Sequence, residues 1–200
     1  MIGTARAQRA LICCCLLLGG GCGAKPGPSA IPDASQRFVA TPSALAVLSQ
    51  SRSWSGLPGD ITFGDPDGRS ALYLQFAPEW RARGAPLRGY LTLEPRLGAT
   101  PDPESVRIEV WRVRAPWRPG ALHTWSDKPE LAPPYVSVLV SSSPARPLRL
   151  DISELLRFLA NNPALDQGIA LIARRGDGHG ASFATGISGG AAPRLEVYTR

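Results

Sequence analysis

Cysteine is absent from most of this chain. All four cysteines lie within the first 22 of its 200 residues: Cys13, Cys14, Cys15 and Cys22. The first three fall in an apolar segment near the N-terminus, and Cys22 has no partner downstream. Once that segment is removed, the rest cannot form an internal disulfide, and its stability must come from a packed core. Cysteine nucleophiles and cysteine-ligated zinc are excluded from it as well.

Histidine and lysine are scarce too. His123 and His179 are the only histidines, and neither has a neighbour at metal-ligand spacing. The lysines include Lys25 and Lys128, and the net charge of +6 comes mostly from arginine. Arginines such as Arg107 stand singly among apolar residues, which is typical of a solvated surface rather than of a phosphate-binding stripe. We therefore predict no histidine-based metal site and no nucleic-acid partner.

A membrane-spanning run is missing near the N-terminus. The apolar segment Ala10–Leu18 has nine residues, whereas a spanning helix needs about 20. It follows Arg6 and Arg9 and precedes three glycines, which is the pattern of a secretory signal peptide. We predict that residues 1–21 form this signal and that the protein is exported.

Cys22, directly after the small residues, resembles the cysteine of a bacterial lipoprotein signal. In such signals the cysteine becomes the first mature residue and carries lipid such as palmitate. Gly19 stands where these signals prefer leucine. The resemblance implies lipidation of Cys22 and a membrane partner. Residue 23 is Gly rather than Asp, which implies the outer membrane, on its periplasmic or surface face; plain secretion is the alternative.

Two parts follow the signal. Residues 22–36 start with Cys22 and are rich in proline and small residues, which predicts an extended tether. Removal of Arg6 and Arg9 with the signal lowers the net charge from +6 to +4. About 179 residues then remain, a length that suits one domain with a full-sized core. We place that domain at residues 37–200.

Most of this domain alternates between apolar and polar residues with a period of two, which predicts β-strands. Because each run has one apolar and one polar face, we expect antiparallel sheets buried on one side. The predicted strands cover residues 71–76, 87–94, 106–110, 136–141, 148–152, 169–171 and 194–198, with weaker candidates at 45–48 and 61–63.

In the run that begins at Val106, the alternation of apolar and polar residues shifts by one position. After Val110 the apolar positions move to Trp111 and Val113. A slip of one residue turns every later side chain to the other face, so this pattern predicts a β-bulge near Val110 and Trp111. The alternative is that Trp111 simply lies on the outer face of its sheet.

One segment is predicted to be helical, at about residues 153–160. Asp151 and Glu154 have the spacing of a capping box, the leucines that follow give an apolar helix face, and Pro163 ends it. About nine short strands and this helix predict an all-β fold, a jelly-roll-like antiparallel β-sandwich.

Six short segments occur in a recognisable order: Ser70–Phe76, Leu91–Leu93, Trp117 with Thr124-Trp125 and Pro129, Leu150–Ser153, Gly168–Leu171 and Pro193–Leu195. Together they resemble the DNRLRE-domain family, a jelly-roll-like sandwich of exported proteins. The match covers residues 37–200, although the acidic-Asn-Arg signature of the family is absent. Asp127-Lys128 also stand where an asparagine-rich turn is usual.

The resemblance implies a non-catalytic module similar to carbohydrate-binding modules that recognise acidic polysaccharides. We therefore expect a lipid-anchored binding module for an envelope or extracellular polysaccharide, and no enzyme. The alternative is a structural or assembly lipoprotein whose sandwich contacts another envelope protein.

Aromatic rings and arginines are the side chains expected to bind such a ligand. Aromatic faces cover the C–H surface of a sugar ring, and arginine binds a uronate carboxylate through two hydrogen bonds. The same tryptophans could instead pack in the core, and that alternative stays open, especially for Trp117 and Trp125. Trp54 and Trp80 are further tryptophans left open. The predicted ligand-binding residues are Trp111, Arg112, Arg114, Trp117, Arg118 and Trp125.

Two further motifs carry less information. Gly186–Gly190 fits the G-x-S-x-G pattern, but no helix follows Ser188, so the nucleophile elbow of a hydrolase is not predicted. Asp65 and Asp67, with Asp60 upstream, resemble half of a calcium loop, and a tight turn explains them equally well. We predict no catalytic residues, no cofactor and no metal beyond that structural calcium alternative.

Overall fold

The computed structural model describes residues 36–50, 59–64, 69–96, 105–141, 144–173, 180–187 and 191–200. All of them belong to one of two contact units of the chain, residues 31–200. The strands are β1 (Gln36–Ala40), β2 (Ala44–Ser49), β3 (Asp60–Phe63), β4 (Ser70–Gln75), β5 (Pro86–Leu93), β6 (Ser105–Val113), β7 (Leu131–Ser141), β8 (Leu148–Asp151), β9 (Ile169–Ala173), β10 (Ala181–Ala184) and β11 (Arg194–Thr199). The helices are α1 (Ser153–Asn161) and four 3-10 turns, η1 (Pro78–Arg83), η2 (Pro119–Ala121), η3 (Trp125–Asp127) and η4 (Pro163–Leu165).

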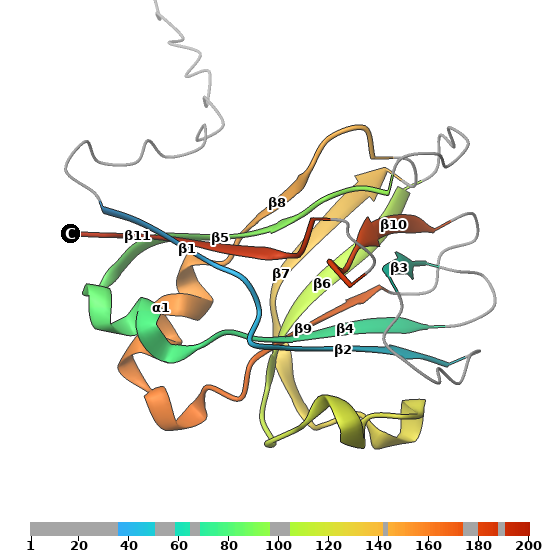
Figure 1. The fold of residues 1–200 in the computed structure, drawn as a ribbon, viewed down its shortest axis with the longest axis horizontal. Helices are drawn as coiled ribbons and strands as arrows, with labels where there is room; N and C mark the ends of the chain where they lie inside the picture. The colour runs from blue at the N-terminus through green and yellow to red at the C-terminus, as the bar shows by residue number, and fades with distance from the viewer. Residues whose placement is uncertain are drawn as a thin grey trace, which may run out of the picture. The chain divides into compact units, whose positions relative to one another are not determined.

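These elements form the predicted all-β sandwich. One sheet has the order β1-β11-β5-β8 and the other has the order β2-β4-β9-β6-β7, with antiparallel pairing throughout (Figure 1). A two-stranded sheet, β10-β3, is linked to the end of β5 because Pro95 bridges to Phe183. The predicted helix is confirmed as α1.

The main core lies between the two large sheets. Alternate residues of β5, such as Leu91 and Leu93, and of β6, such as Ile108 and Val110, are fully buried in one apolar cluster. Each buried leucine or isoleucine of this kind contributes roughly 1.5–3 kcal/mol through removal of apolar surface from water. The period of two therefore positions the polar residues of β5 and β11 on the opposite, outer face of their sheet.

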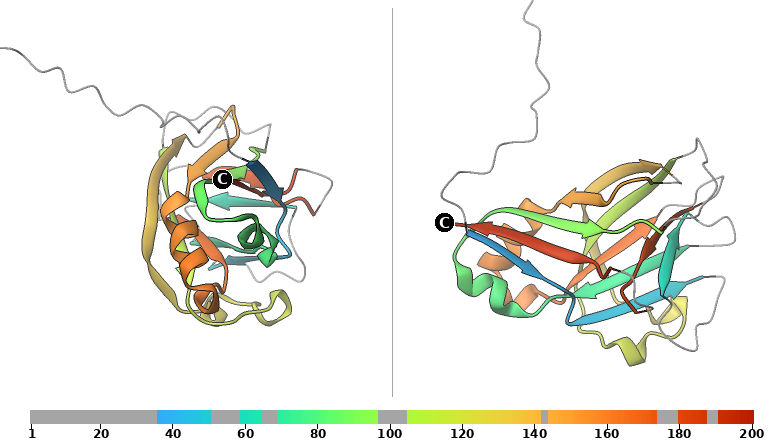
Figure 2. Two further views of the ribbon diagram at one scale, coloured as in Figure 1. Left: turned by 90° about the vertical axis from the view of Figure 1, so that its left-hand side faces the viewer. Right: turned by 45° about the horizontal axis from the view of Figure 1, so that its top comes forward.

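Helix α1 and the η1 turn fill one end of the sandwich (Figure 2). Leu155, Leu156 and Leu159 of α1 and Trp80 of η1 belong to the main core. Helix α1 approaches β5 closely at Gly89, where an added Cβ would lie 2.1 Å from Cδ1 of Leu156 and would force that side chain to move. This end is closed on the inner side of β5.

The predicted capping box at the start of α1 is only half correct. The side chain of Asp151 accepts hydrogen bonds from the backbone N–H and the hydroxyl of Ser153. Glu154, however, forms an ion pair with Arg157 one turn further on rather than bonding back to the chain before the helix. Because Ile152 rather than Asp151 is the N-cap residue, Glu154 is the second residue of the helix and not the third, where a capping box needs it.

A second apolar cluster lies on the outer face of the five-stranded sheet. Residues 114–130 form the loop that carries η2 and η3 across this face (yellow-green at the bottom of Figure 1). Beneath it, Ala71 and Tyr73 of β4 are fully buried with Trp117 and Leu122 of the loop. Strand β4 is therefore buried on both faces.

The pairing of β6 with β7 shifts where the bulge was predicted. Val110 pairs with Val136, but the next residue, Trp111, pairs with Pro134, so Tyr135 of β7 is the extra residue. The pairing of β6 with β9 is regular over the same positions. The register shift is thus confirmed, but the inserted residue lies in β7. Strand β6 keeps its alternation, and Trp111 packs against the outer cluster, as the alternative predicted.

Within the described residues, the longest apolar helical segment falls short of the length and hydropathy needed to cross a bilayer.

Candidate binding face

The outer face of the β1-β11-β5-β8 sheet carries a group of arginine and tyrosine side chains. The strands contribute residues far apart in sequence, because β11 pairs with both β1 and β5, and β8 with β5. We call this surface the arginine–tyrosine face. Its members are Arg37, Arg88, Tyr90, Thr92, Glu94, Arg149, Asp151, Arg194, Glu196 and Tyr198.

Tyr90 is at the centre of the face. The guanidinium carbon of Arg149 lies 3.6 Å from the centroid of the Tyr90 ring. The ring of Tyr198 approaches Tyr90 edge-on, with centroids 6.1 Å apart. A cation over an aromatic face and an edge-to-face ring pair are both attractive, so these contacts hold the three side chains in fixed positions.

Glu196 links the two arginines on either side of the face. One carboxylate oxygen lies 3.1 Å from Arg37 and the other 3.2 Å from Arg149, and the hydroxyl of Tyr198 lies 3.3 Å from the second oxygen. Burial of Glu196 raises its pKa, but the hydrogen bonds and charges of Arg37 and Arg149 outweigh that effect, so the pKa lies below its ordinary value. The hydrogen bond and charge of Glu196 likewise raise the pKa of Arg37. Glu196 is therefore an anion at neutral pH and cannot serve as a general acid there.

The other two arginines are paired as well. Arg194 contacts Glu94, and Arg88 lies 3.9 Å from Asp151. Each guanidinium has five N–H donors, and each of these ion pairs has its closest contact through one arginine nitrogen. Since the side chains of Arg37, Arg149 and Arg194 are 56%, 43% and 42% exposed, N–H groups remain for an added anion.

Nothing among the described elements covers this face. Helix α1 and the η1 turn lie on the inner side of the sheet, between it and the second sheet (Figures 1 and 2). The cavity at that closed end is lined by Phe76, Trp80, Leu156 and Asp166, among others, and measures about 10 Å³. Such a space has room for about one water molecule, so a sugar cannot enter this cavity.

The predicted site residue Trp117 is a packing residue. It is 9% exposed and lies in the outer cluster. Its ring meets Tyr73 edge-on at 5.8 Å, and its indole N–H donates to the backbone oxygen of Gln167 at 2.7 Å. For Trp117 the structure supports packing, the alternative that the sequence left open.

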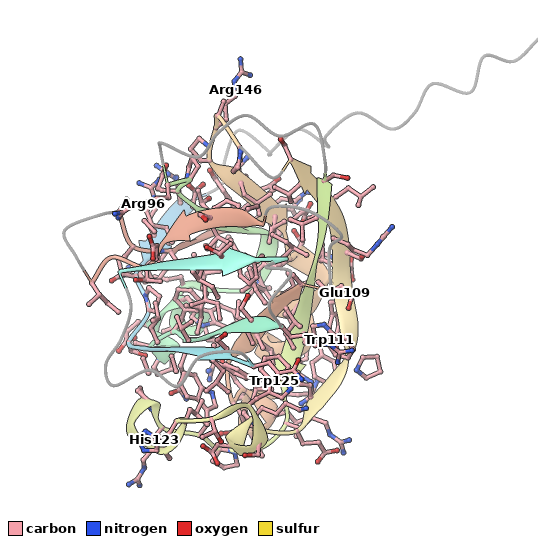
Figure 3. The ribbon with its side chains drawn as sticks, turned by 90° about the vertical axis from the view of Figure 1, so that its right-hand side faces the viewer. Arg96, Glu109, Trp111, His123, Trp125 and Arg146 are labelled. Atoms are coloured by element: carbon pink, nitrogen blue, oxygen red, sulfur yellow. The ribbon has the colours of Figure 1, made fainter. Side chains whose placement is uncertain are left out.

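Trp111 and Trp125 are half-buried and pack against the same cluster (Figure 3). The ammonium of Lys128 lies 5.2 Å from the centroid of the Trp125 ring. The indole nitrogen of Trp111 is buried and has no hydrogen-bond partner in the described part of the chain. Both rings therefore contribute most of their surface to packing.

The three predicted arginines are not brought together. Arg112 lies over the ring of Phe158, with 5.2 Å between its guanidinium carbon and the ring centroid. Arg114 pairs with Glu130 at 2.6 Å in an exposed position, and Arg118 is exposed on the loop. Arg112 and Trp111 point to opposite faces of β6, because they are neighbours on one strand. Arg112 therefore does not share the face on which Trp111, Trp117 and Trp125 pack together.

The remaining sequence candidates contribute no metal site that the structure describes. Asp60 lies 3.5 Å from Arg96, and His123 is exposed at the tip of the loop (Figure 3). Groups of three or more His, Cys, Asp or Glu side chains able to hold a metal are not found within the described ranges. The other predicted or weighed residues lie outside those ranges: Cys22, Trp54, Asp65, Asp67, His179 and Ser188.

Comparison with models of known protein families gives no match, and comparison with curated proteins gives none either. The resemblance to the DNRLRE-domain family therefore rests on the sequence landmarks alone.

The sequence contained a signal for the arginine–tyrosine face. Every second residue from 88 to 94 is polar or a tyrosine, in the order Arg, Tyr, Thr, Glu. Every second residue from 194 to 198 gives Arg, Glu, Tyr. What the sequence lacked was the strand order, which places these two runs side by side in register, with Glu196 opposite Tyr90.

Proposed function

We propose that this protein is a non-catalytic binding module whose arginine–tyrosine face recognises an acidic polysaccharide. The observation that carries the proposal is the convergence of Arg37, Arg149, Tyr90 and Tyr198 on one uncovered sheet face. An array of partly exposed guanidinium and phenol groups on one sheet face suits an extended ligand with repeated carboxylates, because each arginine can bind a carboxylate through two N–H groups.

The carboxylates of the face support binding rather than catalysis. Glu94, Asp151 and Glu196 each lie next to an arginine. A glycosidase needs one carboxyl group with a raised pKa to protonate the leaving oxygen, whereas the pKa of Glu196 is lowered. The same carboxylates compete with a bound uronate for the arginines, so we expect weak binding to one sugar and stronger binding to a chain.

The proposed location of the protein in the cell envelope rests on the sequence of its N-terminal residues. The signal-like residues 1–21 and the lipoprotein-like Cys22 lead us to propose an exported module anchored by lipid in the outer membrane. Mass spectrometry of the membrane-extracted protein tests this part: an acylated N-terminal Cys22 is expected, and a mature form that retains residues 1–21 would overturn it.

Affinity electrophoresis in gels that contain polygalacturonate or a neutral glucan tests the ligand class. We expect retardation only by the acidic polymer, and loss of that retardation in Arg149→Ala. Arg118→Ala is the matched control, since Arg118 is exposed but lies on the loop of the other sheet. A wild-type chain that ignores both polymers would refute the proposal, and equal loss in both variants would place the site elsewhere.

A further inference from the structure

Thr92 lies in the middle of the arginine–tyrosine face, and its hydroxyl is unused. The residue is 5% exposed, and its Oγ1 atom is buried without a hydrogen-bond partner in the described residues. Leu91 and Leu93, its neighbours on β5, belong to the core, so the Thr92 side chain lies on the outer face of the sheet. A buried hydroxyl without a partner is uncommon in native proteins, and this one lies on a face that no described element covers.

A second unused donor lies beside it. Thr92 pairs with Arg194 of β11, and the Nε atom of Arg194 is also buried without a partner in the part of the chain that the structure describes. The contact of Arg194 with Glu94 is made by Nη2, so that ion pair leaves the Nε–H group unsatisfied. A hydroxyl can donate a hydrogen bond, and an arginine Nε–H can only donate. The partner that suits both groups is therefore an oxygen atom that accepts two hydrogen bonds.

Arg149 approaches the same position from the other side of β5. It lies on β8 and pairs with Thr92. Because neighbouring strands are about 4.8 Å apart, the backbones of Arg149 and Arg194 are about 10 Å apart, with Thr92 midway between them. The Arg149 guanidinium lies over Tyr90, the next outward residue of β5. Two positive charges thus flank two unused donors, which favours an anion as the missing partner.

The internal ion pairs indicate which anion suits these arginines. Arg149 contacts Glu196 and Arg194 contacts Glu94, so each already binds a carboxylate. Their side chains are 43% and 42% exposed, so each can turn to admit a further carboxylate oxygen. On a sugar, a uronate residue supplies that group.

We propose that Arg194, Thr92 and Arg149 form a subsite that binds one carboxylate of the acidic polysaccharide. One carboxylate oxygen accepts hydrogen bonds from the Thr92 hydroxyl and the Arg194 Nε–H, and the other oxygen accepts from Arg149. This inference rests on the proposed function for the identity of the ligand. It adds a residue that determines specificity, because arginines alone attract any polyanion, whereas the Thr92 hydroxyl needs an acceptor at one position.

Replacement of Thr92 by Val tests the subsite, because valine keeps the branched shape and removes the hydroxyl. We expect the dissociation constant for polygalacturonate, measured by affinity electrophoresis, to rise about tenfold or more, since a hydrogen bond to a charged group is lost. The melting temperature should stay the same or rise, because the hydroxyl has no partner in the described residues. Thr92→Ser keeps the hydroxyl and should bind as the wild type does. Unchanged binding in Thr92→Val, or weaker binding with a lower melting temperature, would overturn the proposal.

Thr62→Val is the matched control. The Thr62 hydroxyl lies on the β10-β3 sheet and hydrogen-bonds to the Ser182 hydroxyl at 2.8 Å. This variant should show the opposite pattern, with a lower melting temperature and unchanged binding. Equal loss of binding in Thr62→Val and Thr92→Val would contradict the subsite.

Arg194→Lys separates the Nε–H donor from the charge. Lysine keeps the positive charge and can pair with Glu94, but it has no donor at the position of Nε. Binding should therefore weaken about as much as in Thr92→Val. Binding equal to that of the wild type would show that charge alone is sufficient and would overturn the subsite.

NMR of the arginine Nε–H signals separates the failure of this subsite from the failure of the proposed function. When the purified full chain is titrated with trigalacturonate, the Arg194 signal should shift and the Arg118 signal should not. An equal shift with a neutral galactose trisaccharide would overturn the subsite. If polygalacturonate retards the chain but the Arg194 signal does not move, the subsite is wrong and the proposed function stands. If the signal moves but no acidic polymer is bound, the subsite stands and the proposed function is wrong.

Discussion

The indole N–H of Trp117 donates a hydrogen bond to the backbone oxygen of Gln167, 2.7 Å away. Gln167 directly precedes Gly168 and β9, so this bond fastens the loop of residues 114–130 to the start of a central strand. It also explains why Trp117 is a structural residue: both its ring and its polar atom are used inside the domain.

Replacement of Trp117 by Ala should lower the free energy of unfolding by about 3 kcal/mol or more, because a buried aromatic ring leaves a cavity. Urea unfolding gives the value. Trp125→Ala is the comparison, since Trp125 is only half-buried and should lose less. If Trp117→Ala kept its stability but no longer bound polysaccharide, Trp117 would be a ligand-binding residue rather than a packing residue.

Replacement of Tyr73 by Phe should leave stability unchanged or raise it by about 1 kcal/mol. The hydroxyl of Tyr73 is buried and has no hydrogen-bond partner in the described residues, and such a group costs desolvation energy. Melting temperatures at pH 8 provide the measurement. A marked decrease in the melting temperature would mean that the Tyr73 hydroxyl has a hydrogen-bond partner after all.

The same variant should gain relative stability in alkali. Burial raises the pKa of the Tyr73 phenol well above its ordinary value of 10.0. A group whose pKa is raised by folding contributes full stability below its unfolded pKa and loses that contribution as the pH rises above it. The wild-type chain should therefore lose stability above pH 10 faster than Tyr73→Phe does, as thermal unfolding over this pH range can show.

Gly168→Ala should destabilise the fold strongly, by about 2 kcal/mol or more. Gly168 has a φ of +94°, and an added Cβ would lie 2.5 Å from the backbone oxygen of Leu74. Gly120→Ala is the matched control, because a Cβ there meets nothing within 4 Å. Urea unfolding of the two variants should separate them clearly, and similar losses would contradict the assigned geometry at Gly168.

Glu196 should make stability depend on acid pH. Its pKa is lowered in the folded chain, so its contribution is present above the ordinary value of 4.5 and is lost as the pH falls through the folded pKa. At pH 7, Glu196→Gln should be about 1 kcal/mol less stable than the wild type, since the two arginine partners are partly exposed. The difference should shrink as the pH falls below 4.5. Urea unfolding at several pH values measures it, and a constant difference would exclude the ion pairs as its cause.

Much of the fold was predictable because alternation is a local property. Every predicted strand lies within or overlaps an observed one, including the weaker candidates that became β2 and β3. Strands β1 and β10 and the η1 turn were not predicted. Two of them are short segments, Gln36–Ala40 and Ala181–Ala184, whose pairing partners lie far away in sequence.

The site was less predictable, because alternation does not show what covers each face of a strand. In β4 the pattern assigns Ala71 and Tyr73 to the less apolar face, yet both are fully buried beneath the loop that carries Trp117. The tryptophans chosen as ligand contacts therefore serve largely as packing. The arginines and tyrosines of the open face come from runs that the sequence shows separately and that only strand order joins.

The pairing of β1 with β11 also determines how this domain responds to mechanical load. Gln36 lies opposite Thr199, so the chain enters the sheet at the same end where it leaves. When force pulls these two ends apart, the hydrogen bonds between β1 and β11 break one after another. We therefore expect the two strands to separate at low force. A force between β1 and a ligand bound on β5 or β8 would instead be shared by the hydrogen bonds of several strands. The domain should therefore resist a pull on its ligand better than a pull that separates its two termini.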